Sequence, residues 1–241
     1  MFNWRQKLHS FIQHPFVKDT AILQAGNFFN IGLGILTSVL TARLLQPDKY
    51  GVYTLISSFA GLIALFMNFG ADRTATTLVA EAYAKKDKIE IKNVLTYFLK
   101  INGVIAPLIG IAAVIVAPFV TLYFYHSSYL GEMSRLAIIT FIFVGTFWSL
   151  LTIALQVSRR MMNYVLLDNL NTLLRSALCI GLILLGWGVW GVLMGQLLAA
   201  VIMAIISLFF YRFLAHRSEY FPKIRSLVAS LRQVSIKKYF N

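Results

Sequence analysis

The sequence predicts an all-α, polytopic membrane protein: a six-helix transmembrane lobe with both termini in the cytoplasm. The supporting observations are its composition, its long uncharged runs and the uneven distribution of its positive charge. Of the 241 residues, 59% are hydrophobic and the mean hydropathy is +0.73, which is well above the apolar content of a soluble domain. We expect a cytoplasmic amphipathic N-terminus (1–19), the transmembrane lobe (20–211) and a basic cytoplasmic connecting helix (212–241).

The first two predicted spans, 20–42 and 50–71, contain no charged residue. About 20 apolar residues at 1.5 Å each cross a hydrocarbon core of about 30 Å. Pro47 lies in the short charged turn between them and suits the first turn of the second helix, because it has no backbone N–H to donate. The pattern predicts a transmembrane hairpin, in which Gly51 lets the two helices pack closely.

A mixed-charge helical connection, 72–100, leads to the remaining spans, which we place at 101–125, 136–156, 169–185 and 190–211. Span three contains Pro107, Gly110 and Pro118, so we expect a kink near the membrane centre. The uncharged run 176–211 would extend about 54 Å as one helix, which exceeds the thickness of a bilayer core. The glycine- and tryptophan-rich segment 186–191 therefore has to fold the chain back.

The 22 Lys and Arg residues are distributed unevenly. With a cytoplasmic N-terminus, the opposite side of the membrane carries only Arg43, Lys49 and Arg135. Cytoplasmic loops are enriched in Lys and Arg, so this asymmetry predicts that both termini are cytoplasmic. We assign the net charge of +13 to contacts with anionic headgroups of membrane lipid, and not with nucleic acid.

Apolar residues recur at helical spacing in the first 15 residues and again in 223–238, each time with basic residues beside them. Such segments lie in the membrane interface with the apolar face toward the acyl chains. We therefore expect an interfacial amphipathic helix at each end of the chain.

Span one carries a stripe of small and polar residues. Its members recur about every seven residues or lie close to that line: Gln24, Asn27, Asn30, Gly34, Thr37, Ser38 and Thr41. Two interpretations remain open. Small and polar residues let helices pack and hydrogen-bond across a bundle, or they line a water-filled cavity for a polar substrate. Gly34 and Ser38 fit packing, whereas the amides of Gln24, Asn27 and Asn30 fit a lining.

Arg175 is the one Lys or Arg that falls within a predicted span. A guanidinium there is costly unless it faces a cavity, finds a partner or reaches the interface. It can extend toward the cytoplasmic interface, pair with Asp168 two turns away, or bind an anionic substrate together with Asn171. No Asp or Glu falls within the six predicted spans, and an arginine without carboxylates suits an anionic cargo.

The sequence contains no glycine-rich phosphate loop, H-E-x-x-H, paired carboxylates or nucleophile elbow, so we expect neither enzymatic activity nor a cofactor. His9 and His14 have no third ligand placed to complete a site, and we expect no metal. Cys179, the single cysteine, is interpreted as a packing residue.

The first hairpin also carries a recognisable order of residues: Ala42-Arg43-Leu44-Leu45, then Pro47, then Tyr50-Gly51. In order and spacing it resembles the first hairpin of polysaccharide-biosynthesis exporters, the lipid-linked oligosaccharide flippases of the superfamily that includes multidrug extruders. The likeness continues through Phe69-Gly70 into 72–88 and more loosely to Phe210. Arg43, Pro47, Tyr50 and Gly51 match the motif, and we expect them to be structural.

The resemblance implies a transporter lobe in a bacterial inner membrane that flips undecaprenyl-diphosphate-linked oligosaccharide or exports polysaccharide, for glycans such as O-antigen, exopolysaccharide or lipopolysaccharide. Members of the family have twelve or more spans in two lobes with the cavity between them. A second lobe or a second copy of the chain is therefore an expected partner, and the sequence leaves open whether the chain is part of a longer protein. Two alternatives remain: a cation-coupled multidrug exporter, or a non-transporting membrane scaffold of a glycan-assembly complex.

Overall fold

The computed structural model describes residues 15–68, 71–126, 128–143 and 148–231, and every regular element in these ranges is helical. The helices are α2 (Pro15–Asn68), α3 (Ala71–Ala84), α4 (Lys88–Lys100), α5 (Ala106–Tyr125), α6 (Ser128–Phe143), α7 (Ser149–Val157), α8 (Met161–Leu182), α9 (Gly188–Arg217) and α10 (Ile224–Ser230), with π-helical turns η1 (Ile101–Ile105) and η3 (Ile183–Trp187). The predicted N-terminal amphipathic helix, apart from Pro15, lies outside the described residues, as does everything beyond residue 231.

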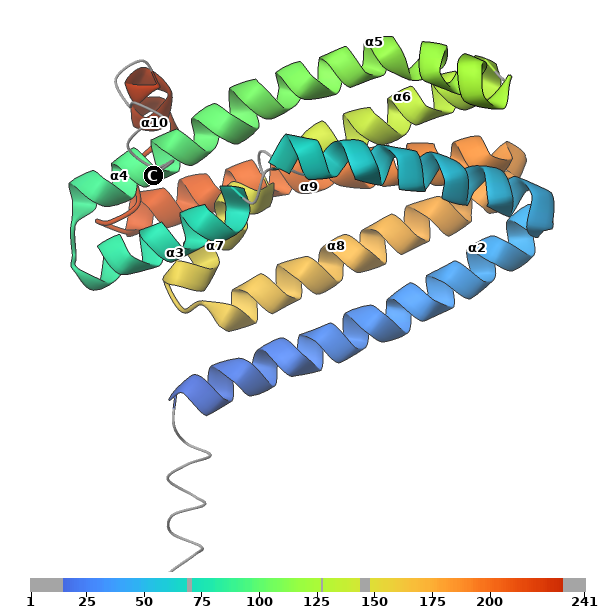
Figure 1. Ribbon diagram of the computed structural model, residues 1–241. Coiled ribbons are helices and arrows are strands. Elements are labelled where there is room, and N and C mark those ends of the chain that lie inside the picture. The colour runs from blue at the N-terminus through green and yellow to red at the C-terminus, as the bar shows by residue number, and fades with distance from the viewer. Residues whose placement is uncertain (1–14, 69–70, 127, 144–147, 232–241) are drawn as a thin grey trace, which may run out of the picture.

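Helix α2 folds back on itself near its middle, as Figure 1 shows. The reversal occurs at Gln46, whose backbone has φ 66° and ψ 161°. A residue that precedes proline is excluded from the α conformation, and Pro47 then begins the returning helix. The predicted helical hairpin is confirmed, and its crossing of a membrane stays a prediction. The packing role predicted for Gly51 is wrong, because nothing lies within 4 Å of a Cβ placed there.

Helices α4 and α5 form one continuous helical run through η1, which precedes Pro107. The proline ring would collide with the carbonyl of Gly103 in a regular α-helix, and the wider π turn at Ile101–Ile105 avoids that collision. The irregular turn therefore lies at the start of predicted span three and not at its centre. Pro118 lies within α5, where the dihedral angles remain helical.

Helices α8 and α9 form a second hairpin that turns at η3. Gly186 and Gly188 have φ values of 87° and 53°, which glycine adopts without the strain that a side chain would add. The predicted turn at 186–191 is thus confirmed. Further along, Gly195 lies against the backbone of Cys179 on α8, so the two helices approach closely at that point.

The long helices run back and forth between two ends of the molecule (Figure 1). One end holds the start of α2, the α3–α4 and α7–α8 turns, the end of α9 and α10. We call it the basic end, because most of the described Lys and Arg residues lie on those segments. A core cluster that includes Val79, Phe98 and Leu227 packs these segments together, and a second cluster around Ile56, Met133 and Leu193 packs the opposite end.

Leu227, on the apolar face predicted for the C-terminal amphipathic helix, is buried in the basic-end core, whereas Val228 is exposed. Helix α9 continues to Arg217, and residues 218–223 separate it from α10. The predicted connecting segment 212–241 is therefore, where described, the end of one helix and a short second one.

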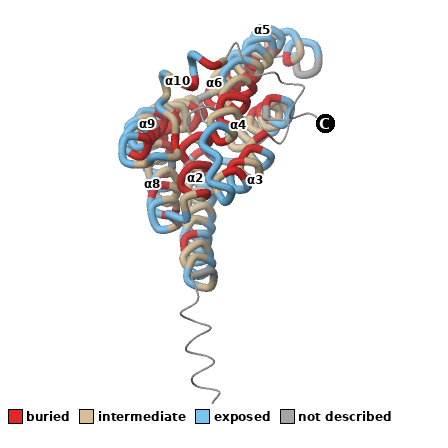
Figure 2. The backbone as a smooth tube through the Cα atoms, turned by 90° about the vertical axis from the view of Figure 1, so that its left-hand side faces the viewer, coloured by how far each residue is buried: buried red, intermediate tan, exposed pale blue. Residues whose placement is uncertain are grey.

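The outward faces of the long helices are largely apolar, and Figure 2 shows buried positions toward the middle with exposed positions around them. Phe28, Leu65, Phe119 and Phe209 are among the large hydrophobic residues that remain exposed. Among the described residues, three helical stretches are long and apolar enough to cross a membrane: Val17–Met67, Lys88–Tyr123 and Met161–Arg217. Exposed apolar surface on this scale is typical of a protein that sits in lipid, so the chain is a membrane protein.

The close approach of α8 and α9 generates a stability prediction. A Cβ at Gly195 would lie 2.7 Å from the backbone nitrogen of Cys179, and backbone cannot move aside cheaply. Gly195→Ala should destabilise the protein by about 1–3 kcal/mol, measured as a lower unfolding temperature in detergent. The matched control is Gly181→Ala, where nothing lies within 4 Å. Equal unfolding temperatures for the two variants would contradict the close approach.

Candidate functional site: a polar seam between α2 and α8

The first half of α2 lies beside α8, and side chains join the two helices at two levels. Asn30 Nδ2 donates to Asp168 Oδ2 at 2.6 Å. Thr37 Oγ1 donates to Ser176 Oγ at 2.7 Å. The sequence separations of the two pairs, 138 and 139 residues, are nearly equal, so the helices run in the same direction. We call this line of contact the polar seam.

Residue size and spacing explain why the helices meet along this line. The side chain of Val165 occupies the space that a Cβ at Gly26 would need, so the absence of that Cβ lets the two helices approach. Asn30 and Thr37 follow on the same face of α2, one and three turns on. Hydrogen bonds between membrane helices contribute about 0.6 kcal/mol each and up to about 1.7.

The sequence-predicted cavity residues fall on or next to this seam. Asn30 is part of it, Gln24 and Asn27 on α2 are exposed, Asn171 on α8 is half-buried, and Arg175 on α8 is exposed. Both helices are right-handed and parallel, and we view them from their N-terminal ends. Residues clockwise of the contact line on α2 then lie on the same side of the seam as residues anticlockwise of it on α8. The first description fits Gln24 and Asn27, and the second fits Asn171 and Arg175. Helix geometry thus groups them along one side of the seam.

Arg175 does not form the ion pair with Asp168 that the sequence left open. In the described part of the chain, no ion pair within 4 Å joins Arg175 to a carboxylate. Asp168 instead accepts from Asn30, while Arg175 remains exposed and acts on it electrostatically at longer range. Arg175 therefore has its guanidinium available to a ligand.

The polar stripe of span one divides into two parts. Asn30 and Thr37 make interhelical bonds, which is the packing role. Ser38 is exposed, and Gly34 has no neighbour within 4 Å of a Cβ placed there. The described residues therefore show no packing role for these two. Gln24, Asn27 and Ser38 are the part of the stripe that the described chain leaves uncovered.

The sequence suggested Asp168 only as a partner of Arg175, and its bond to Asn30 in the seam was not predicted. The seam places Asp168 level with Asn30, which lies about halfway along predicted span one. The position of Asp168 does not fit the expectation that no carboxylate lies within the spans, if span one crosses the membrane as predicted. A signal for this position was present in the sequence, because the residues just before Asp168 are largely apolar. Helix α8 includes them and begins at Met161, so the span can start closer to the basic end than residue 169.

The seam also has hydrogen-bonding capacity that the described chain leaves unused. The Oδ1 atoms of Asn30 and Asn169 are buried and have no donor. Buried acceptors are normally satisfied, so these two atoms mark polar positions at which the seam can accept a further donor.

The motif residues of the first hairpin lie at the end opposite the basic end. Arg43 and Pro47 are exposed there. The rings of Tyr50 and Tyr53 are 6.1 Å apart, and the Tyr53 hydroxyl accepts from Gln196 Nε2 at 2.9 Å. The hairpin turn is thus tied to α9. The structural roles of Arg43 and Tyr50 stay predictions.

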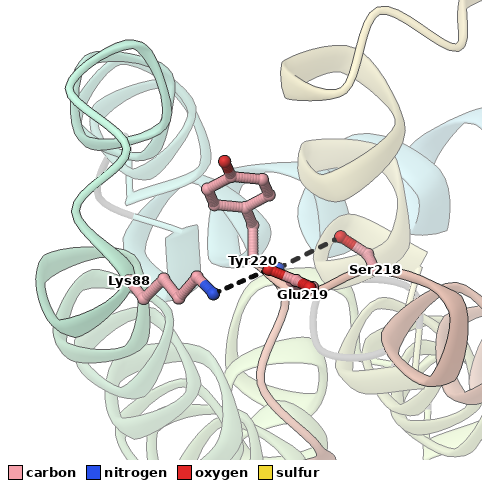
Figure 3. Close-up of polar contacts among 4 residues, drawn as sticks. All are labelled: Lys88, Ser218, Glu219 and Tyr220. Carbon is pink, nitrogen blue, oxygen red and sulfur yellow. Dashed lines mark hydrogen bonds and ion pairs between the residues drawn. The ribbon is translucent and has the colours of Figure 1, made fainter.

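At the basic end, α4 is tied to the segment that follows α9 (Figure 3). Lys88 Nζ lies 3.0 Å from Glu219 Oε2 and 5.4 Å from the centre of the Tyr220 ring. The backbone N–H of Tyr220 donates to Ser218 Oγ at 3.3 Å. Just after α3, Lys85 Nζ donates to Glu81 Oε1 at 2.6 Å, and this hydrogen bond raises the pKa of Lys85. These exposed pairs position segments and add little stability.

In the described ranges, no group of three or more His, Cys, Asp or Glu residues is placed to hold a metal ion. The buried Cys179 thiol donates to the carbonyl of Val192 at 3.4 Å, which fits a packing residue of the α8–α9 interface. The chemistry available at the seam is that of amides, hydroxyls, one carboxylate and one guanidinium.

A family model described as polysaccharide biosynthesis protein matches residues 16–239. The chain belongs to this family. The match confirms the resemblance read from the first hairpin and indicates a transport-related role in polysaccharide biosynthesis.

Stage V sporulation protein B of Bacillus subtilis (strain 168) is 32% identical over 94 residues, which are 39% of this chain and 18% of that protein. The match thus spans less than a fifth of this relative's length. None of the solved structures matches the chain.

Proposed function

We propose that the chain is one lobe of a flippase that moves a lipid-linked oligosaccharide, with an undecaprenyl diphosphate carrier, across a bacterial inner membrane. The observation that carries the proposal is the grouping of Arg175, Asn171, Gln24 and Asn27 along one side of the polar seam, with the guanidinium exposed. A guanidinium binds phosphate oxygens in a bidentate fork, and amides hydrogen-bond sugar hydroxyls. Family membership supplies the context of polysaccharide biosynthesis.

The cavity itself needs a second lobe, from the rest of a longer chain or from another copy. The uncovered polar side of α2 and α8 is the surface that such a lobe would face. The proposal includes no catalytic step. The glycan, whether O-antigen, another lipopolysaccharide component or an exopolysaccharide, is left to experiment.

Asp168 favours a second candidate, the cation-coupled exporter. A carboxylate at membrane depth is the group that binds a coupling proton or sodium ion in such transporters. Asp168 is hydrogen-bonded by Asn30, which also suits a purely structural role. The non-transporting scaffold remains the third alternative, and no structural observation favours it.

The proposed topology has six spans, formed by both halves of α2, by α5, by α6 with α7, by α8 and by α9, and it places the basic end in the cytoplasm. It is supported by the two fold-backs and by the concentration of Lys and Arg at one end. A reporter fused after Tyr125 or Trp187 should read as extracytoplasmic, and one after Lys88, Arg160 or Lys238 as cytoplasmic. A cytoplasmic readout after Trp187 would contradict six spans.

Arg175 provides the test of function, in the full-length transporter expressed in a host that lacks its own copy. Arg175→Ala should abolish glycan export at unchanged membrane abundance, and Arg175→Lys should retain part of it, because a point charge still attracts phosphate without the bidentate fork. The charge-matched control is Arg73→Ala, at an exposed arginine on α3, which should export normally. The amount of glycan at the cell surface and the amount of each transporter variant in the membrane are measured in the same cells.

Three outcomes decide between the candidates. Wild-type export by Arg175→Ala would contradict the flippase site. If Asp168→Asn abolishes export while Arg175→Ala does not, the cation-coupled alternative holds. If both variants only lower abundance, the seam has a structural role alone.

A further inference from the structure

A groove opens at the basic end between the start of α2 and the α7–α8 turn, with a volume of about 650 Å³. Its charged lining residues are Lys18, Asp19, Arg159 and Arg160. None of the three cations forms an ion pair within 4 Å with a described carboxylate. With three cations against one carboxylate, the groove carries a net positive charge.

The turn that holds the two arginines is fixed by its backbone. The Arg160 N–H donates to the carbonyl of Leu155 at 2.9 Å and the Arg159 N–H to that of Gln156 at 3.1 Å. Both side chains are exposed. Next to them, α8 begins without a side-chain cap, and its positive helix end adds to the attraction for an anion.

The groove lies on the opposite side of the seam from the proposed transport residues. Lys18, Ile22, Phe29 and Leu36 share one face of α2, roughly opposite the face of Gln24 and Asn27. Phe29 and Leu36 are exposed. Beyond the cationic mouth, this side of α2 is therefore apolar and faces lipid.

Helix α8 supplies a matching apolar strip. Met162, Leu166 and Leu173 follow one another at helical spacing from the mouth, and all three are exposed. A ligand that suits this surface has an anionic head at the level of the arginines and an aliphatic chain beside the two helices. An anionic phospholipid has both parts.

We propose that this groove is a binding site for the phosphate headgroup of a resident anionic phospholipid, whose acyl chains lie along Phe29 and Leu36 of α2 and Leu166 of α8. The lipid binds outside the transport pathway and joins the start of α2 to the α7–α8 turn. The inference does not depend on what the protein transports.

The test uses the full chain reconstituted in nanodiscs of phosphatidylcholine with or without phosphatidylglycerol. Lipid retained after purification is counted by native mass spectrometry, and the unfolding temperature is measured in both membranes. The wild type should retain phosphatidylglycerol and unfold at a higher temperature when it is present. Arg159→Gln/Arg160→Gln should bind it about 25-fold more weakly, since each of the two basic residues near the membrane surface contributes about a factor of five.

The matched control is Arg212→Gln/Arg225→Gln, which removes the same charge from a second basic pocket of about 470 Å³ at the same end of the molecule. It should retain phosphatidylglycerol as the wild type does. Equal loss in both double variants would overturn the site, because surface charge in general would then explain the binding. Lys18→Gln provides a second variant of the groove, with a smaller expected loss.

Two competitors identify the occupant. Inorganic diphosphate at the same phosphate concentration should not displace the lipid, because it lacks the acyl chains; full displacement would overturn the assignment of the apolar strip. A polyprenyl diphosphate should compete no better than added phosphatidylglycerol. Preferential displacement by it would mean that the groove holds cargo, and would overturn a resident phospholipid.

Discussion

The hydrogen bonds between α2 and α8 are the contacts on which the arrangement of the first span depends. The first half of α2 lies at the edge of the bundle beside α8 (Figure 1), and few of its residues are buried. In lipid, apolar side chains gain little by leaving one helix surface for another, so packing and polar contacts decide which helices associate. The pairs Asn30–Asp168 and Thr37–Ser176 therefore determine both the partner and the register of this helix.

This register also determines which groups are left open on each side. On one side of the seam are the amides of Gln24 and Asn27 and the guanidinium of Arg175; on the other, apolar strips lead from a cationic groove. The same contacts thus separate a polar surface, suited to a charged sugar-bearing substrate, from a surface suited to resident lipid. At the basic end, a packed core of α3, α4, α7, α9 and α10 supports both of these surfaces.

Much of the fold could be predicted from local chemistry. Pro47 locates the turn of the first hairpin, and the glycines at 186 and 188 locate the second, because each restricts or permits particular backbone angles. The position of Asp168 could not be predicted in this way, since it depends on the register between α2 and α8, and its partner Asn30 is 138 residues away in sequence. The wrong role for Gly51 has a similar origin, because spacing within one helix does not reveal what packs against it.

The register of the seam can be measured directly by disulfide formation in a Cys179→Ala background. Thr37→Cys and Ser176→Cys replace two oxygens that lie 2.7 Å apart, so the pair should oxidise readily within the membrane and resist labelling by maleimide until reduced. Ser38→Cys with Ser176→Cys is the control, because Ser38 is exposed on the next position around the helix and should stay fully labelled. Equal labelling of the two pairs under oxidising conditions would contradict the parallel α2–α8 seam.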